Sequence, residues 1–223
     1  MGRLQGLVAT LERFYGVLPT PPSDPFAFFV WEMLSARTTV ARRGKAFGAL
    51  KQLRALTPDS LARAAPARLS AAVALAGPYL EDRLQALRAG ADAFRRTPAL
   101  AATIGGPSPS ARRALKALPQ LGPQGARRLL FFVAERATLP TDPGVVRAGR
   151  RLGFGRAIGA TGGSRSVRQA MSVDLPRGDT VAMRRVFLYL SHHATAACTE
   201  RDPRCRVCPL LDECPEGRRR APA

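Results

Sequence analysis

The chain has 223 residues, 46% of them hydrophobic, which is enough to bury one large core or two modest ones and argues against intrinsic disorder. Its apolar runs fall well short of the roughly 20 residues that a membrane span needs, and no signal peptide precedes them, so we expect a soluble, cytoplasmic protein. Alanine, leucine and arginine dominate while β-branched and aromatic residues are sparse, which predicts an all-α fold.

The charge is strongly positive. Lysine and arginine outnumber aspartate and glutamate by 35 to 16, a net charge of +19, and only Lys45, Lys51 and Lys116 are lysines. A genome biased toward alanine and arginine would explain the choice of arginine over lysine but not so large a positive excess. Because arginine matches phosphate oxygens and releases counterions, a nucleic acid is the favoured partner.

The N-terminal elements are predicted from apolar spacing. Residues 1–16 form a short amphipathic helix that ends at Gly16, with Leu4, Leu7, Val8, Leu11 and Phe14 on its apolar face. A proline-rich connector follows. The segment 25–40 is apolar all round, which indicates a helix buried on most sides.

Alanine- and leucine-rich helices separated by short breaks fill residues 41–110. Thr57 before Pro58 and Ser70 before an alanine run are expected helix starts. The segment 104–110 contains glycine and proline, and Ser110 is expected to cap the next helix.

Residues 111–135 predict a helix, a tight break at LPQLG and a second helix with Pro123 in its first turn. Gly122 would let the backbone approach a ligand closely, and the free N–H groups at the start of the second helix would point at an anion. The same pattern also serves as an ordinary turn between packed helices, so the motif alone leaves both interpretations open.

Two further elements lead to the C-terminus. Asp142 stands directly before Pro143 and a new helix, and a last long helix runs from about Asp179 to Ala197. It carries His192 and His193, which we expect to be packing or helix-end residues.

All four cysteines lie in the last 26 residues with the spacing C-x6-C-x2-C-x5-C: Cys198, Cys205, Cys208 and Cys214. Loops this short bring their ends together at little entropic cost, so one four-sulfur site is expected. Two disulfides suit small secreted domains rather than this chain, and a zinc site usually pairs two C-x2-4-C knuckles where only one is present. A [4Fe-4S] cluster is therefore favoured, with disulfides and zinc as the alternatives.

The hairpin, the aspartate and the cysteine loop follow one another as in the endonuclease III family of helix-hairpin-helix DNA glycosylases, which the chain resembles over about residues 20–215. LSARTT at 34–39 is similar to the family's LSAQ-type segment, and GPY at 77–79 stands where the family has a Gly-Leu-Tyr turn.

The resemblance implies a fold of two helical lobes with a DNA-binding cleft between them. One lobe, residues 18–137, would be a six-helix barrel domain with the helix-hairpin-helix at about 111–135. The other, residues 1–17 plus 138–223, would hold the [4Fe-4S] cluster. It also implies double-stranded DNA with a damaged, mispaired or abasic site as the partner, a target base flipped into the cleft, and a protein that acts as a monomer, associated with the nucleoid if the source is bacterial.

The same resemblance assigns catalytic roles. Asp142 matches the aspartate that supports departure of the base, although Asp142 before Pro143 is also a good helix N-cap. Gln124, 18 residues earlier, stands where bifunctional members carry a Schiff-base lysine. An amide cannot replace that amine, and exposed Lys116 is a poor substitute.

Other positions are expected to contact DNA. Arg37 stands at the place of a glutamine that fills the void left by a flipped base, Pro78 at that of a leucine wedge, and Gly144 replaces a histidine, so the family's oxidised-pyrimidine specificity is not carried over. The expected DNA-binding residues are Arg37, Pro78, Tyr79, Leu118, Leu121, Gly122, Gly125, Arg201 and Arg204.

The resemblance thus implies a base-excision repair glycosylase that removes a damaged or mispaired base by hydrolysis, with doubtful AP-lyase activity. The alternative is a weak or inactive member that binds abasic or distorted DNA. A full bifunctional glycosylase/AP lyase fits the sequence least well.

Overall fold

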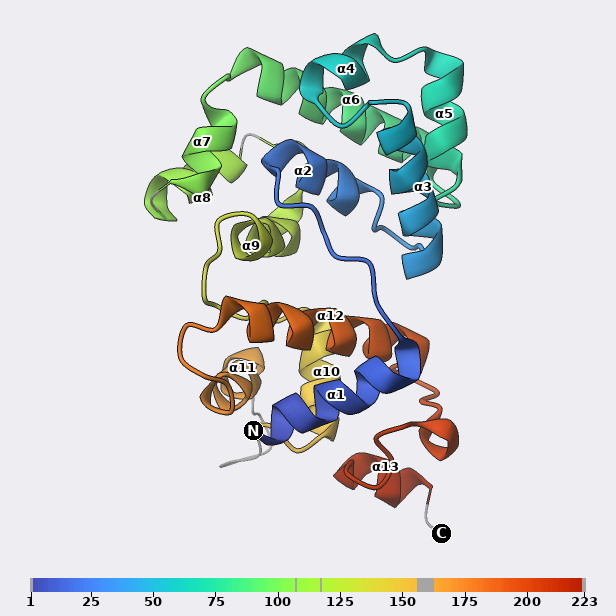
Figure 1. Ribbon diagram of the computed structural model, residues 1–223, viewed down its shortest axis with the longest axis vertical. Coiled ribbons are helices and arrows are strands. Elements are labelled where there is room, and N and C mark those ends of the chain that lie inside the picture. The colour runs from blue at the N-terminus through green and yellow to red at the C-terminus, as the bar shows by residue number, and fades with distance from the viewer. Residues whose placement is uncertain (1, 107, 117, 156–162, 222–223) are drawn as a thin grey trace. The chain divides into compact units, whose positions relative to one another are not determined.

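The computed structural model describes residues 2–106, 108–116, 118–155 and 163–221. In these ranges the chain forms 13 α-helices and one short 3-10 helix, without a β-strand (Figure 1). The all-α prediction is confirmed. None of the helices in the described ranges is both long and apolar enough to cross a membrane.

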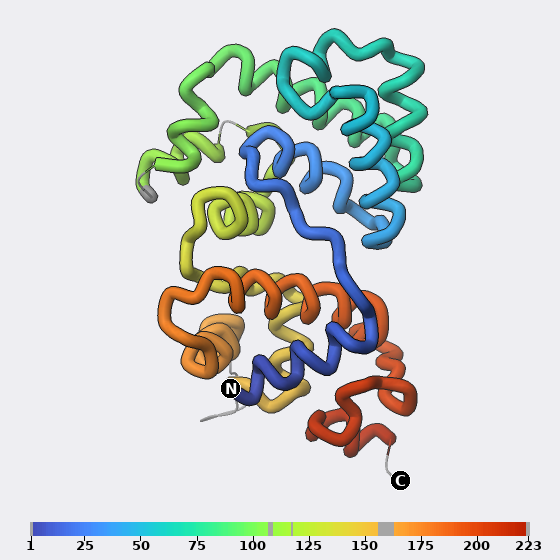
Figure 2. The backbone as a smooth tube through the Cα atoms, viewed as in Figure 1, coloured from blue at the N-terminus to red at the C-terminus, as the bar shows by residue number. Residues whose placement is uncertain are grey.

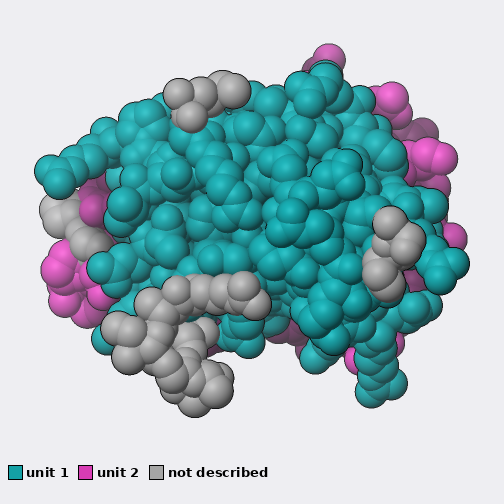
Figure 3. All heavy atoms as spheres, turned by 90° about the horizontal axis from the view of Figure 1, so that it is seen from below, with its two compact units in different colours: residues 1–18, 137–223 teal, residues 19–136 magenta. Residues whose placement is uncertain are grey.

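The chain divides into two compact units, coloured separately in Figure 3. Unit 1 comprises residues 1–18 and 137–223, and unit 2 comprises residues 19–136. The described helices of unit 1 are α1 (Arg3–Tyr15), α10 (Pro143–Arg151), α11 (Ser164–Val173), α12 (Thr180–Ala196), η1 (Cys205–Val207) and α13 (Pro215–Arg220). Those of unit 2 are α2 (Pro25–Met33), α3 (Val40–Gln52), α4 (Pro58–Arg63), α5 (Pro66–Ala74), α6 (Leu80–Arg96), α7 (Leu100–Gly105), α8 (Ser108–Leu115) and α9 (Gly122–Phe132).

Unit 1 is built around α12, which packs against α1 and α10 (Figure 2). The predicted apolar face of α1 buries Leu4, Leu7, Val8 and Leu11. The prediction for Phe14 was wrong, because this side chain is 57% exposed. Tyr15 turns inward instead, and its hydroxyl pairs with Nδ1 of His193 at 2.9 Å.

Helix α10 approaches α12 closely at Gly144. A Cβ atom added there would lie 2.9 Å from the Cβ of Ala194, a distance that real Cβ contacts do not show. The absence of a side chain at this position is therefore a packing requirement.

Unit 2 is built around α2, whose residues Phe26 to Trp31 are all buried, as the apolar pattern predicted. Helix α6 approaches it so closely that a Cβ at Gly90 would lie 2.0 Å from the ring of Phe29. On α9, Phe132 stacks against Phe28 with ring centroids 5.8 Å apart. Unit 2 has eight described α-helices, two of which, α4 and α7, are short segments of six residues each.

Some predicted helix ends hold and others do not. Thr57 caps α4, with Pro58 as its first residue. Ser70 and Ser110, expected at helix starts, lie inside α5 and α8. The prediction failed because proline fixes the backbone angle of a first helical turn, and α5 begins at Pro66 for that reason.

Candidate functional site

The predicted hairpin consists of α8, a turn and α9. In the turn, Gln120 and Gly122 have positive φ angles of 58° and 63°, and α9 begins at Gly122 with Pro123 in its first turn. No side chain in the described part of the chain caps the start of α9. The backbone N–H groups of this helix end are thus suited to an external acceptor such as a phosphate.

The hairpin residues expected to contact DNA or take part in catalysis differ in their burial. Leu118 and Leu121 are buried at 5% exposure each, so their side chains pack inside unit 2. Gly125 is buried as well, and a Cβ there would lie 2.9 Å from Leu121. Gln124 is half-buried, and its Oε1 accepts a hydrogen bond from Arg127 at 3.5 Å.

A surface pocket of unit 2 brings other predicted residues together. It encloses about 990 Å³ of space, part of it open to solvent, and Arg37, Tyr79, Gln120 and Leu121 line it. The backbones of Arg37, Tyr79 and Gln120 all have positive φ angles, at 45°, 69° and 58°. Such conformations are unfavourable for residues other than glycine, and they cluster at functional sites.

Arg37 and Tyr79 form an exposed pair at this pocket. Nη1 of Arg37 donates to the Tyr79 hydroxyl at 2.6 Å, and the guanidinium lies over the tyrosine ring, 5.3 Å from its centroid. Tyr79 is 43% exposed, and neighbouring Pro78 is exposed too. A flat aromatic and guanidinium surface of this kind suits the stacking of an unpaired base.

Glu32, Ser35 and Arg128 also line this pocket, and hydrogen bonds connect them to one another or to Arg43. The carboxylate of Glu32 accepts two hydrogen bonds from Arg128, one of them from Nε at 3.1 Å. Arg43 stacks on Trp31, 4.2 Å from the ring centroid, and donates to Ser35 Oγ at 2.9 Å. Burial lowers the pKa of Arg43 to about 10; Arg128 contributes to this, and Glu32 opposes it.

Asp142 belongs to unit 1 and occupies the N-cap position of α10. Among the described residues, its carboxylate accepts no capping hydrogen bond from the first turn of that helix. By contrast, the Asp179 carboxylate at the start of α12 accepts from Ala182 N–H at 2.8 Å. The position of Asp142 is thus that of a cap, but its side chain is not used as one.

The four cysteines line one pocket of unit 1, with about 400 Å³ of empty space that includes some open solvent. All four are free thiols, so the disulfide alternative is not supported. Over the described ranges, no group of three or more His, Cys, Asp or Glu side chains is close enough to hold one metal ion.

Burial and the neighbouring cysteines raise the pKa values of Cys208 and Cys214. Burial is the main cause that raises the pKa of Cys208 to about 11; a hydrogen bond from Leu210 N–H opposes it, and the other three cysteines add to it. Backbone N–H groups donate to sulfur at 3.4 Å in Cys208 and at 3.3 Å in Cys214. Such bonds stabilise a thiolate, and a positively charged group bound in the pocket would favour the deprotonated form of these thiols.

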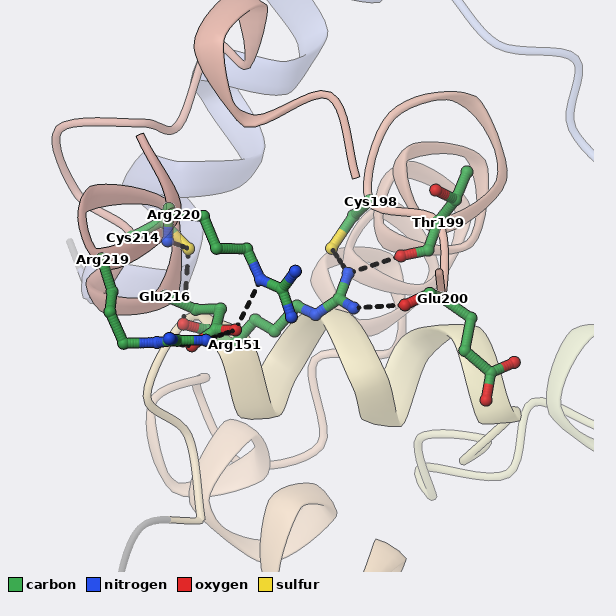
Figure 4. Close-up of polar contacts among 9 residues, drawn as sticks. Arg151, Cys198, Thr199, Glu200, Cys214, Glu216, Arg219 and Arg220 are labelled. Carbon is green, nitrogen blue, oxygen red and sulfur yellow. Dashed lines mark hydrogen bonds and ion pairs between the residues drawn. The ribbon is translucent and has the colours of Figure 1, made fainter. Parts of the chain in front are cut away.

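Two arginines of α10 hold the first cysteine, and Figure 4 shows the contacts of one of them, Arg151. Nη1 of Arg151 donates to Sγ of Cys198 at 3.3 Å and to the Thr199 carbonyl at 2.6 Å, and Nη2 donates to the Glu200 carbonyl at 3.0 Å. One turn earlier, Arg147 donates to the carbonyls of Cys198 at 3.0 Å and Ala194 at 2.7 Å. The cysteine loop is thus fixed to α10 by guanidinium groups.

Helix α13 closes the other side of this pocket (Figure 4). The Glu216 carboxylate accepts hydrogen bonds from Arg219 and Arg220 at 2.7 to 3.0 Å. These bonds lower the pKa of Glu216 to about 2. In the loop between the first two cysteines, Arg201 and Arg204 are both exposed, as a phosphate contact would require.

Several solved structures share this helical fold. A trapped covalent endonuclease III–DNA intermediate with an estranged adenine matches with a TM-score of 0.65 and 19% identity, covering 99% of both chains. A thermostable thymine-DNA glycosylase matches with a TM-score of 0.62 and 18% identity, covering 97% of both chains. At these identities the similarity shows the fold alone.

A curated relative adds a match in sequence. Endonuclease III of Treponema pallidum (strain Nichols) is 26% identical over 215 residues, which cover 94% of this chain and 95% of the relative. Over nearly its whole length, the chain is thus similar in sequence to an endonuclease III and similar in fold to solved endonuclease III structures. No family model matches it.

In this endonuclease III-like protein, sequence reasoning missed the residues that hold the site together. Arg147 and Arg151 lie four residues apart and so project from one face of α10, a spacing that was visible in the sequence. Arg83 is almost fully buried, at 2% exposure, and no sequence signal distinguished it from the surface arginines.

Proposed function

We propose that this endonuclease III-like protein is a monofunctional DNA glycosylase. It would flip a damaged or mispaired base out of double-stranded DNA and release that base by hydrolysis. The observation that carries the proposal is Gln124, which puts an amide in the second residue after the hairpin glycine, where an amine would be needed for strand cleavage.

Asp142 is the proposed catalytic carboxylate. It stands at the N-cap position of α10, 18 residues after Gln124, where the resemblance places the family's catalytic aspartate. A carboxylate beside the sugar would stabilise the positive charge that develops as the base departs, and it would orient and deprotonate the attacking water.

With Gln124 at this position, the proposed reaction stops after base removal and does not proceed to strand cleavage. The γ-amide nitrogen has no basic lone pair, so it cannot attack the sugar and form a Schiff base. Lys116, the only lysine near the hairpin, is exposed at the end of α8 and is no substitute. The product would be an intact strand with an abasic site.

DNA binding would use the hairpin for phosphate and the pocket of unit 2 for the separated bases. The uncapped start of α9 and the φ of 63° at Gly122 suit a close backbone contact with phosphate. Arg37, Pro78 and Tyr79 are exposed, as residues that enter the base stack must be.

The four cysteines would hold a [4Fe-4S] cluster. The shared pocket and the N–H···S hydrogen bonds suit a group held by four thiolates, and the C-x6-C-x2-C-x5-C spacing favours the cluster over zinc. When bound, the cluster supplies positive charge that anchors four thiolates. The chain's own contribution is the loop carrying Arg201 and Arg204, which would contact the DNA backbone.

A second candidate is a family member that binds abasic or distorted DNA without turnover. Gln124, Pro78 and Gly144 favour it, since each departs from the family pattern. For Gly144, however, the close approach of α10 to α12 supplies a packing reason.

Release of free base from duplexes that carry a panel of lesions and mismatches tests the proposal. Wild-type protein should release a base from at least one duplex. Asp142→Asn should reduce the single-turnover rate by about a hundredfold or more. The control is Asp92→Asn, an exposed carboxylate on α6, which should leave the rate unchanged.

Base release that is insensitive to Asp142→Asn would refute the role of this residue. No base release from any duplex, together with lesion-selective binding, would establish the second candidate instead.

A further inference from the structure

A single buried arginine joins the two loops that carry the exposed Arg37 and Tyr79 pair. Arg83 is 2% exposed and lies in the first turn and a half of α6. Its Nη1 donates to the carbonyl of Gly77 at 3.0 Å and also to that of Pro78, and its Nη2 donates to the carbonyl of Ala36. One guanidinium thus satisfies carbonyls from both the 34–39 loop and the 75–79 loop.

These loops need such a link because their backbones are strained. Arg37 in the first loop and Tyr79 in the second have φ angles of 45° and 69°, conformations that side-chain-bearing residues rarely adopt. Conformations of this kind persist only when the surrounding structure determines them strongly. Besides the bonds of Arg83, Thr38 Oγ1 donates to the Ala76 carbonyl at 2.6 Å, and the side chains of Arg37 and Tyr79 pair with each other.

The location of Arg83 is unfavourable for the helix that carries it. A positive charge in the first turns of a helix opposes the helix dipole, and burial removes the charge from water. The acidic Glu81 and Asp82 precede it on α6, yet the hydrogen bonds of Arg83 go to carbonyls. Because the helix dipole and burial both disfavour a charge here, the hydrogen bonds of Arg83 to the loop carbonyls are the reason for an arginine at this position.

We propose that Arg83 is a positioning residue that locks the 34–39 and 75–79 loops together and so presents Arg37 and Tyr79 as a preassembled surface for DNA. The inference rests on the proposed function for its consequence on DNA, but the locking itself concerns unit 2 alone. Because the guanidinium reaches three carbonyls in a planar fork, a lysine at this position keeps the charge and loses the link.

Amide hydrogen exchange tests the locking without DNA. In Arg83→Lys, exchange in residues 34–39 and 75–79 should speed up by roughly tenfold or more, because local opening no longer breaks the arginine bonds. Arg88→Lys, on the exposed face of the same helix, is the control and should exchange as wild type does. Unchanged exchange of both loops in Arg83→Lys would overturn the proposal.

Binding tests the consequence, with a duplex that carries a tetrahydrofuran abasic analogue and the same duplex undamaged. Arg83→Lys should weaken binding to the analogue by roughly tenfold and change binding to undamaged DNA by less than about twofold. Adding it to Tyr79→Ala should cause little further loss, because both changes act through one loop. Additive losses, or equal losses on both duplexes, would contradict the positioning role.

The two proposals fail in different ways. If wild-type protein does not distinguish the two duplexes, the proposed function loses its support while the exchange result still decides the locking. If Arg83→Ala fails to fold, Arg83→Lys carries the test, since it retains the charge and most of the side-chain volume.

Discussion

In the proposed reaction, Asp142 supplies a carboxylate and Gln124 stands where strand cleavage would need an amine. Gln124 lies on the first turn of α9, half-buried, and its side chain contacts Arg127. An amine at this position would have a positive neighbour in Arg127, which lowers the pKa of an ammonium group and favours its nucleophilic form. The scaffold could therefore accept a lysine.

Gln124→Lys should gain lyase activity for that reason. Borohydride trapping on an abasic duplex should yield a covalent protein–DNA adduct with the variant and little or none with wild type. Gln85→Lys, the same change on the exposed face of α6, should not yield the adduct. Efficient trapping of wild type would show that another amine in this chain does the work.

At the scale of single helices, Gly144 shows how a departure from the family pattern can have a packing cause. A Cβ there would meet the Cβ of Ala194, which is itself attached to the α12 backbone and cannot move aside. Overpacking of this kind typically costs about 1–3 kcal/mol.

Gly144→Ala should lower the midpoint of thermal unfolding. Gly6→Ala, on α1 of the same unit, has no heavy atom within 4 Å of the added Cβ, so it should raise stability by about 0.5–1 kcal/mol through helix propensity. Circular dichroism melts of the two variants measure both shifts, and shifts of the same sign would contradict the packing argument.

The link between α10 and the cysteine loop makes a prediction about the proposed cluster. Arg151 binds the sulfur of Cys198 and the next two carbonyls, and outer contacts of this kind typically contribute about 10- to 100-fold to metal retention. Arg151→Gln should therefore reduce the iron content and the visible absorbance of purified protein. Arg165→Gln, exposed on α11, is the control. Equal iron in Arg151→Gln and wild type would count against the role of this link.

Helix starts could be predicted where a cap residue precedes proline or an apolar helix, as at Thr57, Asp142 and Asp179. The predictions for Ser70 and Ser110 were wrong because α5 begins earlier, at Pro66, and α8 begins at Ser108, so both serines lie inside a helix. Arg83 could not be predicted, since its carbonyl partner at Ala36 is 47 residues away in the sequence. The spacing of the four cysteines predicted a common site because that site is local.

At the scale of the whole molecule, a net charge of +19 should govern DNA binding. Cations that neutralise phosphates release counterions, so affinity falls steeply with salt. Binding to a lesion-free duplex should weaken at least about tenfold between 50 and 200 mM salt. Fluorescence anisotropy measures it, and an affinity that hardly changes would show that the charge excess is not used for phosphate contacts.

The most direct test compares strand breaks before and after alkali on one lesion-bearing duplex treated with wild-type protein. We expect breaks to appear only after alkali, because a monofunctional glycosylase leaves an abasic site in an intact strand. Equal breakage without alkali would contradict the assignment of Gln124, and no breakage in either sample across the lesion panel would contradict the glycosylase itself.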